Sequence, residues 1–321
     1  MADIILKADH LKKVFISGKK SMTAVDDVSF ELERGECLGI VGESGSGKST
    51  IAKMITHLEP VTDGQIFLKG KDITHVGGKS LRKTYQDIQM VFQMPMESFD
   101  PRCTLGDGIG ESLRNMGINR TETRTRVENL LERCGLSKEY ADRYPHQVSG
   151  GQCQRAAIAR ALAVSPEILI CDEATSALDV TVQKQILELL IELKEKENLS
   201  FILICHDLAL IRSFAHQIAV MYLGHIVETI PGEDVSDHAV HPYTKALVGA
   251  QFSVHMDPSK KIESIESEAP SPLDVPVGCP FQNRCEHCME QCKKVMPELK
   301  EISEGHEVAC FYVEKMNDQT G

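Results

Sequence analysis

The eight residues "GESGSGKS", residues 42–49, constrain the fold of this 321-residue chain more than any other segment. They fit the pattern G-x4-G-K-[ST] and lie between an apolar, strand-like segment, "ECLGIVG", and a segment with helical spacing, "STIAKMITHL". Glycines let the backbone wrap closely around phosphate groups, and the N-terminus of the following helix adds a positive dipole. In this context the pattern predicts a phosphate-binding loop and a nucleoside triphosphate as ligand.

The loop residues have separate chemical tasks. Lys48 is expected to place its charge on the β- and γ-phosphates, and the hydroxyl of Ser49 is expected to bind Mg²⁺. A GTPase is disfavoured because the sequence has no guanine-reading N-K-x-D motif after a strand. The residues expected to contact the nucleotide are Gly42, Ser44, Gly45, Ser46, Gly47, Lys48, Ser49 and Thr50.

Strand-like and helix-like segments alternate through most of the first 230 residues. The apolar segments "EILICDE" and "SFILICHD" flank a helix-like stretch, which predicts right-handed crossovers and a parallel sheet covered by helices. Hairpin-like segments with turns at residues 33–35, 69–70 and 223–224 predict an antiparallel layer at the edge of that sheet. Strand patterns vanish from about residue 94 to 163, which predicts a helical insertion. The expected fold class is therefore α/β.

Two boundaries follow from composition. Residues 1–235 are expected to form the nucleotide-binding domain, and residues 236–321 a C-terminal extension that carries a cysteine cluster. Within the extension, residues 259–278 are rich in Pro, Ser and Glu and predict a linker or extended arm.

The bulk properties exclude several classes of protein. A formal net charge of −12 argues against a protein that holds nucleic acid by bulk electrostatics. No apolar run approaches the roughly 20 residues of a transmembrane helix, and the N-terminus lacks the pattern of a signal peptide. We therefore expect a cytosolic protein that reaches a membrane only through a partner.

Polar residues suited to phosphate chemistry follow three more strand-like segments. Asp172 and Glu173 end "ILICDE", where the first is expected to hold Mg²⁺ and the second to polarise the attacking water as general base. Gln93 ends "MVFQ" and is expected to contact Mg²⁺ and that water. His206 ends "FILICH" and is expected to contact the γ-phosphate, because ligands of parallel sheets bind at the carboxyl ends of strands.

A second glycine loop, "VSGGQCQR" at residues 148–155, has no lysine. Ser149 is a good N-cap for a helix that begins at Gly150, and such a helix start attracts anions. Without a lysine, the loop suits a phosphate whose charge another surface already neutralises.

With this loop included, the chain resembles the ATP-binding subunits of ABC transporters over nearly its whole length. The phosphate loop, Gln93, "SGGQ", "ILICDEATSALD" and "CHD" occur in the family's order and approximate spacing. The resemblance implies a P-loop ATPase core that uses ATP and Mg²⁺, with Mg²⁺ ligands Ser49, Gln93 and Asp172. Catalysis would depend on Glu173, His206 and Gln93, and Phe15 would stack on adenine.

The resemblance also implies a role for the lysine-free loop. Two ATPase subunits pair head to tail, and the loop of one caps the γ-phosphate held by the other. The residues expected to act across that interface are Ser149, Gly150, Gly151, Gln152 and Asp179. Cys153 stands where the family usually has Gln or Arg, and we expect only a modest effect.

A narrower resemblance is to the peptide and nickel importer branch, through "VFQMPMESFDPR", "HPYTKAL" and the tail "GCPFQNRCEHCMEQC…GHEVAC". The cysteine spacing C-x5-C-x2-C-x3-C-x17-C favours a metal site over disulfides in a cytosolic chain. The branch pattern skips Cys288 and implies a [4Fe–4S] cluster on four thiolates, with Zn²⁺ as the alternative. Those four are Cys279, Cys285, Cys292 and Cys310.

The function expected from this resemblance is ATP hydrolysis that powers import of peptides, or alternatively of nickel or metal chelates. Expected partners are a second, non-identical ATPase subunit, two membrane permeases and, indirectly, an extracytoplasmic substrate-binding protein. No nucleic acid is expected, and the location would be peripheral, on the cytoplasmic face of the membrane. The alternative is a soluble ABC ATPase acting on nucleic acid or ribosomes. It is disfavoured because the chain has one phosphate loop and no long coiled coil.

Overall fold

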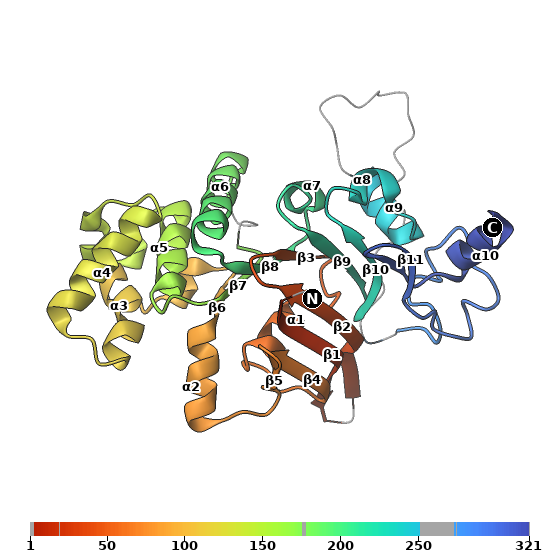
Figure 1. The fold of residues 1–321 in the computed structure, drawn as a ribbon, viewed down its shortest axis with the longest axis horizontal. Coiled ribbons are helices and arrows are strands. Elements are labelled where there is room, and N and C mark those ends of the chain that lie inside the picture. Colours follow the sequence, from red (N-terminus) through yellow and green to blue (C-terminus); the bar gives the residue numbers. More distant parts are fainter. Residues whose placement is uncertain (1–2, 19, 175–177, 251–272, 274, 321) are drawn as a thin grey trace. The chain divides into compact units, whose positions relative to one another are not determined.

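The computed structural model describes residues 3–18, 20–174, 178–250, 273 and 275–320. The chain forms two compact units (Figure 1). The first contains Met1–Leu32, Cys37–Thr74 and Cys205–Gly321, and the second contains Glu33–Glu36 and His75–Ile204. Most of the arm predicted at residues 259–278 lies outside the described residues, and the domain boundary predicted at residue 235 stays a prediction.

The first unit contains a four-stranded sheet in the order β2-β1-β4-β5. β1 (Ile4–Ser17) pairs antiparallel with β4 (Asp63–Leu68), which pairs antiparallel with β5 (Lys71–Asp72). The turn between β4 and β5 has left-handed backbone at Lys69 and Gly70, with φ of 51° and 72°. This confirms the hairpin predicted at residues 69–70.

The hairpin predicted at residues 33–35 is wrong. β2 (Lys20–Glu33) belongs to the four-stranded sheet, whereas β3 (Cys37–Val41) pairs in parallel with β9 (Gln217–Tyr222) in another sheet. All five residues of β3 are buried, while β2 has exposed positions along its length. A strand buried on both faces fits the interior of a covered sheet, so the turn carries the chain from one sheet into the other.

The second sheet of the first unit continues from β3 and β9 through the C-terminal extension. β10 (His225–Pro231) pairs antiparallel with β9, which confirms the hairpin predicted at residues 223–224. β12 (His306–Val308) pairs antiparallel with β10, and β11 (Lys300–Ser303) pairs with β12. The sequence patterns did not predict these last two strands. The helices of this unit are α1 (Lys48–Ile55), α7 (Leu208–Ile211), α8 (Val235–His238), α9 (Pro242–Gly249) and α10 (Phe311–Thr320).

The second unit contains three parallel strands. β6 (Ile88–Val91), β7 (Ile168–Asp172) and β8 (Ser200–Cys205) pair in that order, and every residue of β7 and β8 is buried. Between β6 and β7 the regular elements are all helical, as the α/β class with a helical insertion predicts. The helices of this unit are α2 (Gly78–Asp87), η1 (Pro95–Ser98), α3 (Leu105–Asn115), α4 (Arg120–Arg133), η2 (Lys138–Asp142), η3 (Pro145–Gln147), α5 (Gly150–Leu162) and α6 (Val180–Glu197).

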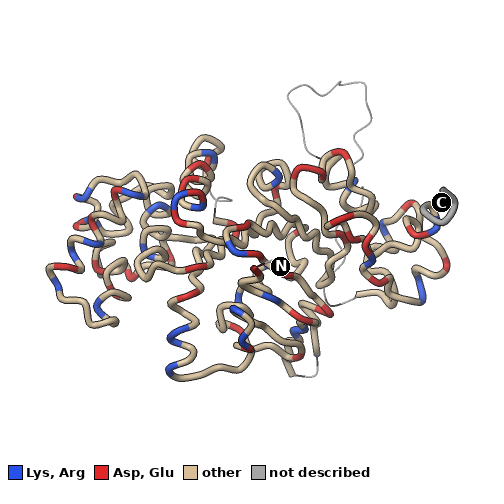
Figure 2. Tube along the Cα trace, in the orientation of Figure 1, with Lys and Arg blue, Asp and Glu red and all other residues tan. Residues whose placement is uncertain are grey.

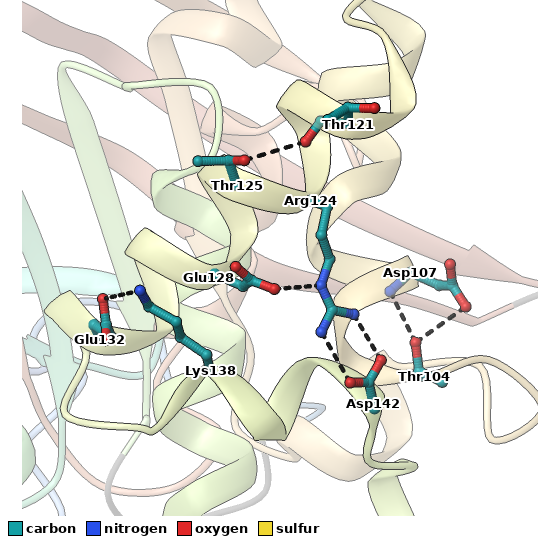
Figure 3. Close-up of polar contacts among 9 residues, drawn as sticks. All are labelled: Thr104, Asp107, Thr121, Arg124, Thr125, Glu128, Glu132, Lys138 and Asp142. Atoms are coloured by element: carbon teal, nitrogen blue, oxygen red, sulfur yellow. Dashed lines mark hydrogen bonds and ion pairs between the residues drawn. The ribbon is translucent and has the colours of Figure 1, made fainter.

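Polar contacts organise the surface of this helical insertion. Acidic and basic residues are interspersed along its helices (Figure 2). Thr104 caps α3 by accepting the Asp107 amide, and Arg124 of α4 binds both Glu128 and Asp142 (Figure 3). Such exposed pairs add little stability each, so the buried leucines and isoleucines of α3–α5 hold the insertion together.

Within the first unit, a buried carboxylate joins the C-terminal extension to β10. Glu228 of β10 is fully buried, and its Oε1 lies 2.8 Å from Nε2 of His306 in β12. The same carboxylate accepts the backbone amides of Val240 and His241 at 2.8 and 3.2 Å. Three donors from two segments therefore meet one carboxylate of β10, as expected because a buried carboxylate is stable only when its oxygens are bonded.

Replacing His306 by Ala should destabilise the chain by about 3 kcal/mol, because it removes one partner of a buried pair. The matched control is His238→Ala, since His238 pairs with Asp234 on the surface and its side chain is 68% exposed. That change should cost less than about 1 kcal/mol. Urea denaturation measures both values, and equal effects would contradict a structural role for the Glu228 contact.

Candidate functional site

The phosphate loop leads from β3 into α1 within the first unit. Lys48 is buried, and its Nζ donates to the carbonyl oxygens of Gly42 and Glu43, each at 2.8 Å. Ser44 and Gly45 are exposed at the tip of the loop. The lysine charge is thus held at the base of a loop whose tip is open to a ligand.

Two glycines of the loop are required by neighbouring backbone. A Cβ on Gly42 would lie 2.2 Å from the carbonyl oxygen of Met221, and one on Gly47 would lie 2.3 Å from that of Ala24. Gly47, which precedes α1, has a φ of 105°, a conformation that residues with side chains rarely adopt. The glycine pattern therefore reflects close packing of the loop against neighbouring backbone as well as room for phosphate.

Two other residues predicted to contact the nucleotide belong to the first unit. Phe15 is half-buried near the end of β1, and the Lys13 ammonium lies 4.8 Å from its ring centroid. His206 is exposed directly after β8, and Asp207 beside it caps α7 through the amides of Ala209 and Leu210. These positions are compatible with the predicted adenine and γ-phosphate contacts, which stay predictions.

The second unit brings together two of the predicted catalytic side chains. Nε2 of Gln93 donates to Oε2 of Glu173 at 2.7 Å, across the carboxyl ends of β6 and β7. Glu173 has a φ of 46°, and its amide donates to the Ile204 carbonyl of β8 at 2.9 Å. A non-glycine residue in this conformation is strained by about 1 kcal/mol or more. The strand ends hold it there, next to the buried Asp172.

The lysine-free loop begins α5 as predicted. Oγ of Ser149 accepts the Gln152 amide at 3.3 Å, and Oε1 of Gln152 accepts the Ser149 amide at 2.9 Å. This reciprocal capping explains why both residue types occur here. Ser149 and Gly150 remain exposed, so the start of the helix can meet a ligand or a partner.

The same loop packs against the start of α6. A Cβ on Gly151 would lie 2.6 Å from Cγ1 of Val182, so no side chain fits there. Asp179, exposed at the N-cap of α6, accepts the Val182 amide at 3.0 Å. The predicted interface residues are thus placed by local caps and packing, and their contact with a second subunit stays a prediction.

Burial determines the character of three cysteines outside the C-terminal extension. Cys134, Cys153 and Cys171 are buried in the second unit, where burial raises their pKa to about 12, 11 and 12. Cys153 is fully buried on α5 and fills core space as a small apolar side chain, which accounts for its tolerance in the lysine-free loop.

The cysteine side chains of the C-terminal extension do not form the predicted metal site in this structure. Among the residues the structure describes, no three His, Cys, Asp or Glu side chains are arranged to hold a metal ion. Burial raises the pKa of Cys279 to about 12 and that of Cys285 to about 11, and a protonated thiol is a poor metal ligand. All five cysteines nevertheless line one small cavity, so the donor chemistry of a thiolate site is gathered there.

Three residues at the phosphate loop were missed by the sequence analysis. Arg284 of the extension binds the carboxylate of Glu43, and the Tyr243 hydroxyl accepts the Glu43 amide at 2.9 Å. Tyr243 belongs to "HPYTKAL", which indicates only the family, and Arg284 belongs to "CPFQNRC", in which only the cysteines suggested a site. No local pattern connects positions about 200 residues apart in sequence.

None of the helices in the described part of the chain has the length and apolar character needed to cross a bilayer. Residues 25–176 match the ABC transporter family, and residues 227–292 match the oligopeptide/dipeptide transporter C-terminal region.

Curated proteins resemble the chain over almost its full length. The oligopeptide transport ATP-binding protein OppF of Salmonella typhimurium is 43% identical over 95% of this chain and 92% of its own. The di/tripeptide transport ATP-binding protein DppF of Pseudomonas aeruginosa is 40% identical over 95% of both chains. AppF of Bacillus subtilis, an oligopeptide transport ATP-binding protein, is 46% identical over 89% of this chain and 88% of its own.

Solved structures resemble the ATPase part. The ATP-binding cassette MJ0796, in a dimeric post-hydrolysis state bound to ADP and Pi, has a TM-score of 0.65 and 30% identity. It covers 70% of this chain and 98% of its own. CbiO1 of Clostridium perfringens, part of an ABC transporter complex, has a TM-score of 0.66 and 28% identity over 74% of this chain and 92% of its own. The chain therefore belongs to the ATP-binding subunits of ABC transporters, in the group with the oligopeptide/dipeptide C-terminal region, and is an ABC-type ATPase.

Proposed function

We propose that this chain hydrolyses ATP to power the uptake of peptides through separate membrane subunits. Relatives that match about nine-tenths or more of the chain are described as oligopeptide or di/tripeptide transport ATP-binding proteins, which supports peptide cargo over nickel or metal chelates. The similarity also includes the oligopeptide/dipeptide transporter C-terminal region. An ATPase that acts on nucleic acid or ribosomes is not favoured by any of these relatives.

The contact between Gln93 and Glu173 is the observation that carries the hydrolytic role. In the proposed mechanism, Lys48 and the loop amides bind the phosphates of ATP, and Ser49, Gln93 and Asp172 hold Mg²⁺. The carboxylate of Glu173 accepts a proton from water as that water attacks the γ-phosphorus, and His206 contacts the same phosphate. Gln93 orients the Glu173 carboxylate through the 2.7 Å hydrogen bond.

The proposed partners follow from the lysine-free loop, which is proposed to act on ATP bound by a second subunit. Ser149, Gly150, Gly151, Gln152 and Asp179 are proposed to meet the γ-phosphate of a second ATPase subunit in a head-to-tail dimer. The dimeric state of the related cassette MJ0796 supports such pairing. The second subunit is proposed to be a non-identical paralogue. The pair would act on two permeases at the cytoplasmic face of the membrane, and indirectly on an extracytoplasmic binding protein.

Replacing Glu173 by Gln should lower ATP hydrolysis by about 100-fold or more, because the amide cannot take up the proton. ATP binding should persist, and the closed dimer should last longer. Phosphate release by the assembled complex measures the rate, and light scattering with ATP measures the dimer. The matched control is Glu188→Gln, an exposed glutamate on α6 that pairs with Lys184. A Glu173→Gln variant with the wild-type rate would exclude Glu173 as the base.

The cysteine cavity supports a second proposal. Cys279, Cys285, Cys292 and Cys310 are proposed to hold a [4Fe–4S] cluster, with Zn²⁺ as the alternative. Four thiols around one cavity fit the donor set of either metal, and such a group would crosslink segments of the extension that have little regular structure. Cys288 lines the same cavity and is half-exposed.

Protein purified without oxygen should absorb broadly near about 400 nm and contain about four irons per chain. Cys285→Ser should remove most of that iron, while Cys103→Ser should not, because Cys103 is an exposed thiol outside the extension. Metal analysis measures the iron content of both variants, and absorption spectra measure the band near about 400 nm. A colourless chain with one zinc would replace the cluster by the alternative, and metal-free wild-type protein would refute both.

A further inference from the structure

A buried arginine of the C-terminal extension ends on the phosphate loop. The Arg284 side chain is 5% exposed, and its Nη1 and Nη2 lie 2.8 and 3.1 Å from the two carboxylate oxygens of Glu43. Both residues belong to the first unit, and Glu43 is the second residue of "GESGSGKS". A two-point guanidinium–carboxylate contact fixes orientation as well as distance.

Glu43 is held at two further points. Its amide donates to the Tyr243 hydroxyl at 2.9 Å, and its carbonyl oxygen accepts from Nζ of Lys48 at 2.8 Å. The residue that receives Arg284 therefore also orients the lysine that binds phosphate. A shift of Glu43 would change the lysine position directly.

The groups that grip Glu43 are themselves fixed by an aromatic cluster. The rings of Tyr222, Tyr243 and Phe281 lie 4.7 to 5.4 Å apart, and Nη1 of Arg284 also donates to the Tyr222 hydroxyl at 3.2 Å. His241 caps α9 by accepting the Tyr243 amide, and burial lowers the pKa of His241 to about 4, so the imidazole stays a neutral acceptor. The Arg284 side chain is therefore held in place by the packed rings next to it.

Charge gives the contact a second role. ATP brings several negative charges to the loop, and a carboxylate on that loop repels them unless a cation compensates it. Arg284 supplies the compensating charge from a site with little solvent to screen it. Loss of the arginine would both release Glu43 and expose its charge to the phosphates.

We propose that Arg284 is a positioning residue for ATP binding, which acts through Glu43 on the phosphate loop. By this inference, the C-terminal extension contributes to ATP binding by orienting the phosphate loop. The inference rests on the assignment of the loop as the ATP site.

The test is a double-mutant cycle on ATP affinity, measured with the full-length chain and a fluorescent ATP analogue. Arg284→Met should raise Kd by about tenfold. Glu43→Gln should raise it only about twofold to threefold, because it loosens the loop but also removes the repulsive charge. The double variant should match Glu43→Gln alone, and Arg284→Lys should lie between wild type and Arg284→Met. Arg126→Met is the control, because Arg126 pairs with Glu122 on the surface of α4.

The outcomes separate the possible failures. Thermal unfolding of each variant shows whether the measurement temperature is well below its midpoint. A Kd for Arg284→Met within twofold of wild type would overturn the inference, even if the midpoint fell. Multiplicative effects in the double variant would overturn the route through Glu43. If wild type bound ATP no better than Lys48→Ala, the loop assignment itself would fail.

Discussion

The phosphate loop is enclosed so closely that two of its positions admit only hydrogen. Gly42 lies against the carbonyl of Met221 in β9, and Gly47 lies against the carbonyl of Ala24 in β2. The loop is therefore positioned by strands from both sheets of the first unit. Because β9 continues into β10, and β10 pairs with β12, the backbone that encloses the loop is continuous with the C-terminal extension.

Gln93 and Glu173, which are proposed to act in hydrolysis, depend on a different constraint within the second unit. Glu173 has a left-handed backbone that would relax to another conformation if nothing opposed it. Its amide bond to Ile204 ties it to β8, and its side chain meets Gln93 after β6. Three parallel strands thus cooperate to aim one carboxylate, as expected at the carboxyl edge of a parallel sheet. In the lysine-free loop, Ser149 and Gln152 cap the start of α5, and Gly151 lets the loop pack against Val182 of α6.

Much of this architecture could be predicted from local patterns. β7 and β8 are short, mostly apolar and wholly buried, and Ser149 precedes a helical run, so these elements follow from burial and capping rules. The turn at residues 33–35 was misread because a tight turn between two strands does not say whether they share a sheet. β11 and β12 have four and three residues, too few to show a period. The cysteine spacing predicted thiols that lie near one another, and all five cysteines of the extension line one small cavity, but the described side chains do not take the arrangement of a metal site.

The contacts of Glu43 show most clearly where sequence reasoning stops. The loop pattern treats position 43 as any residue, yet the structure uses its carboxylate, amide and carbonyl separately. A buried guanidinium costs free energy to desolvate, so its pair with Glu43 is weak evidence for a purely stabilising role. With Glu43, Arg284 forms a neutral pair that contacts the loop backbone next to Lys48 without competing for phosphate. In the role proposed for Arg284, the extension orients the phosphate loop, and the positive charge that faces phosphate comes from Lys48 and the N-terminus of α1.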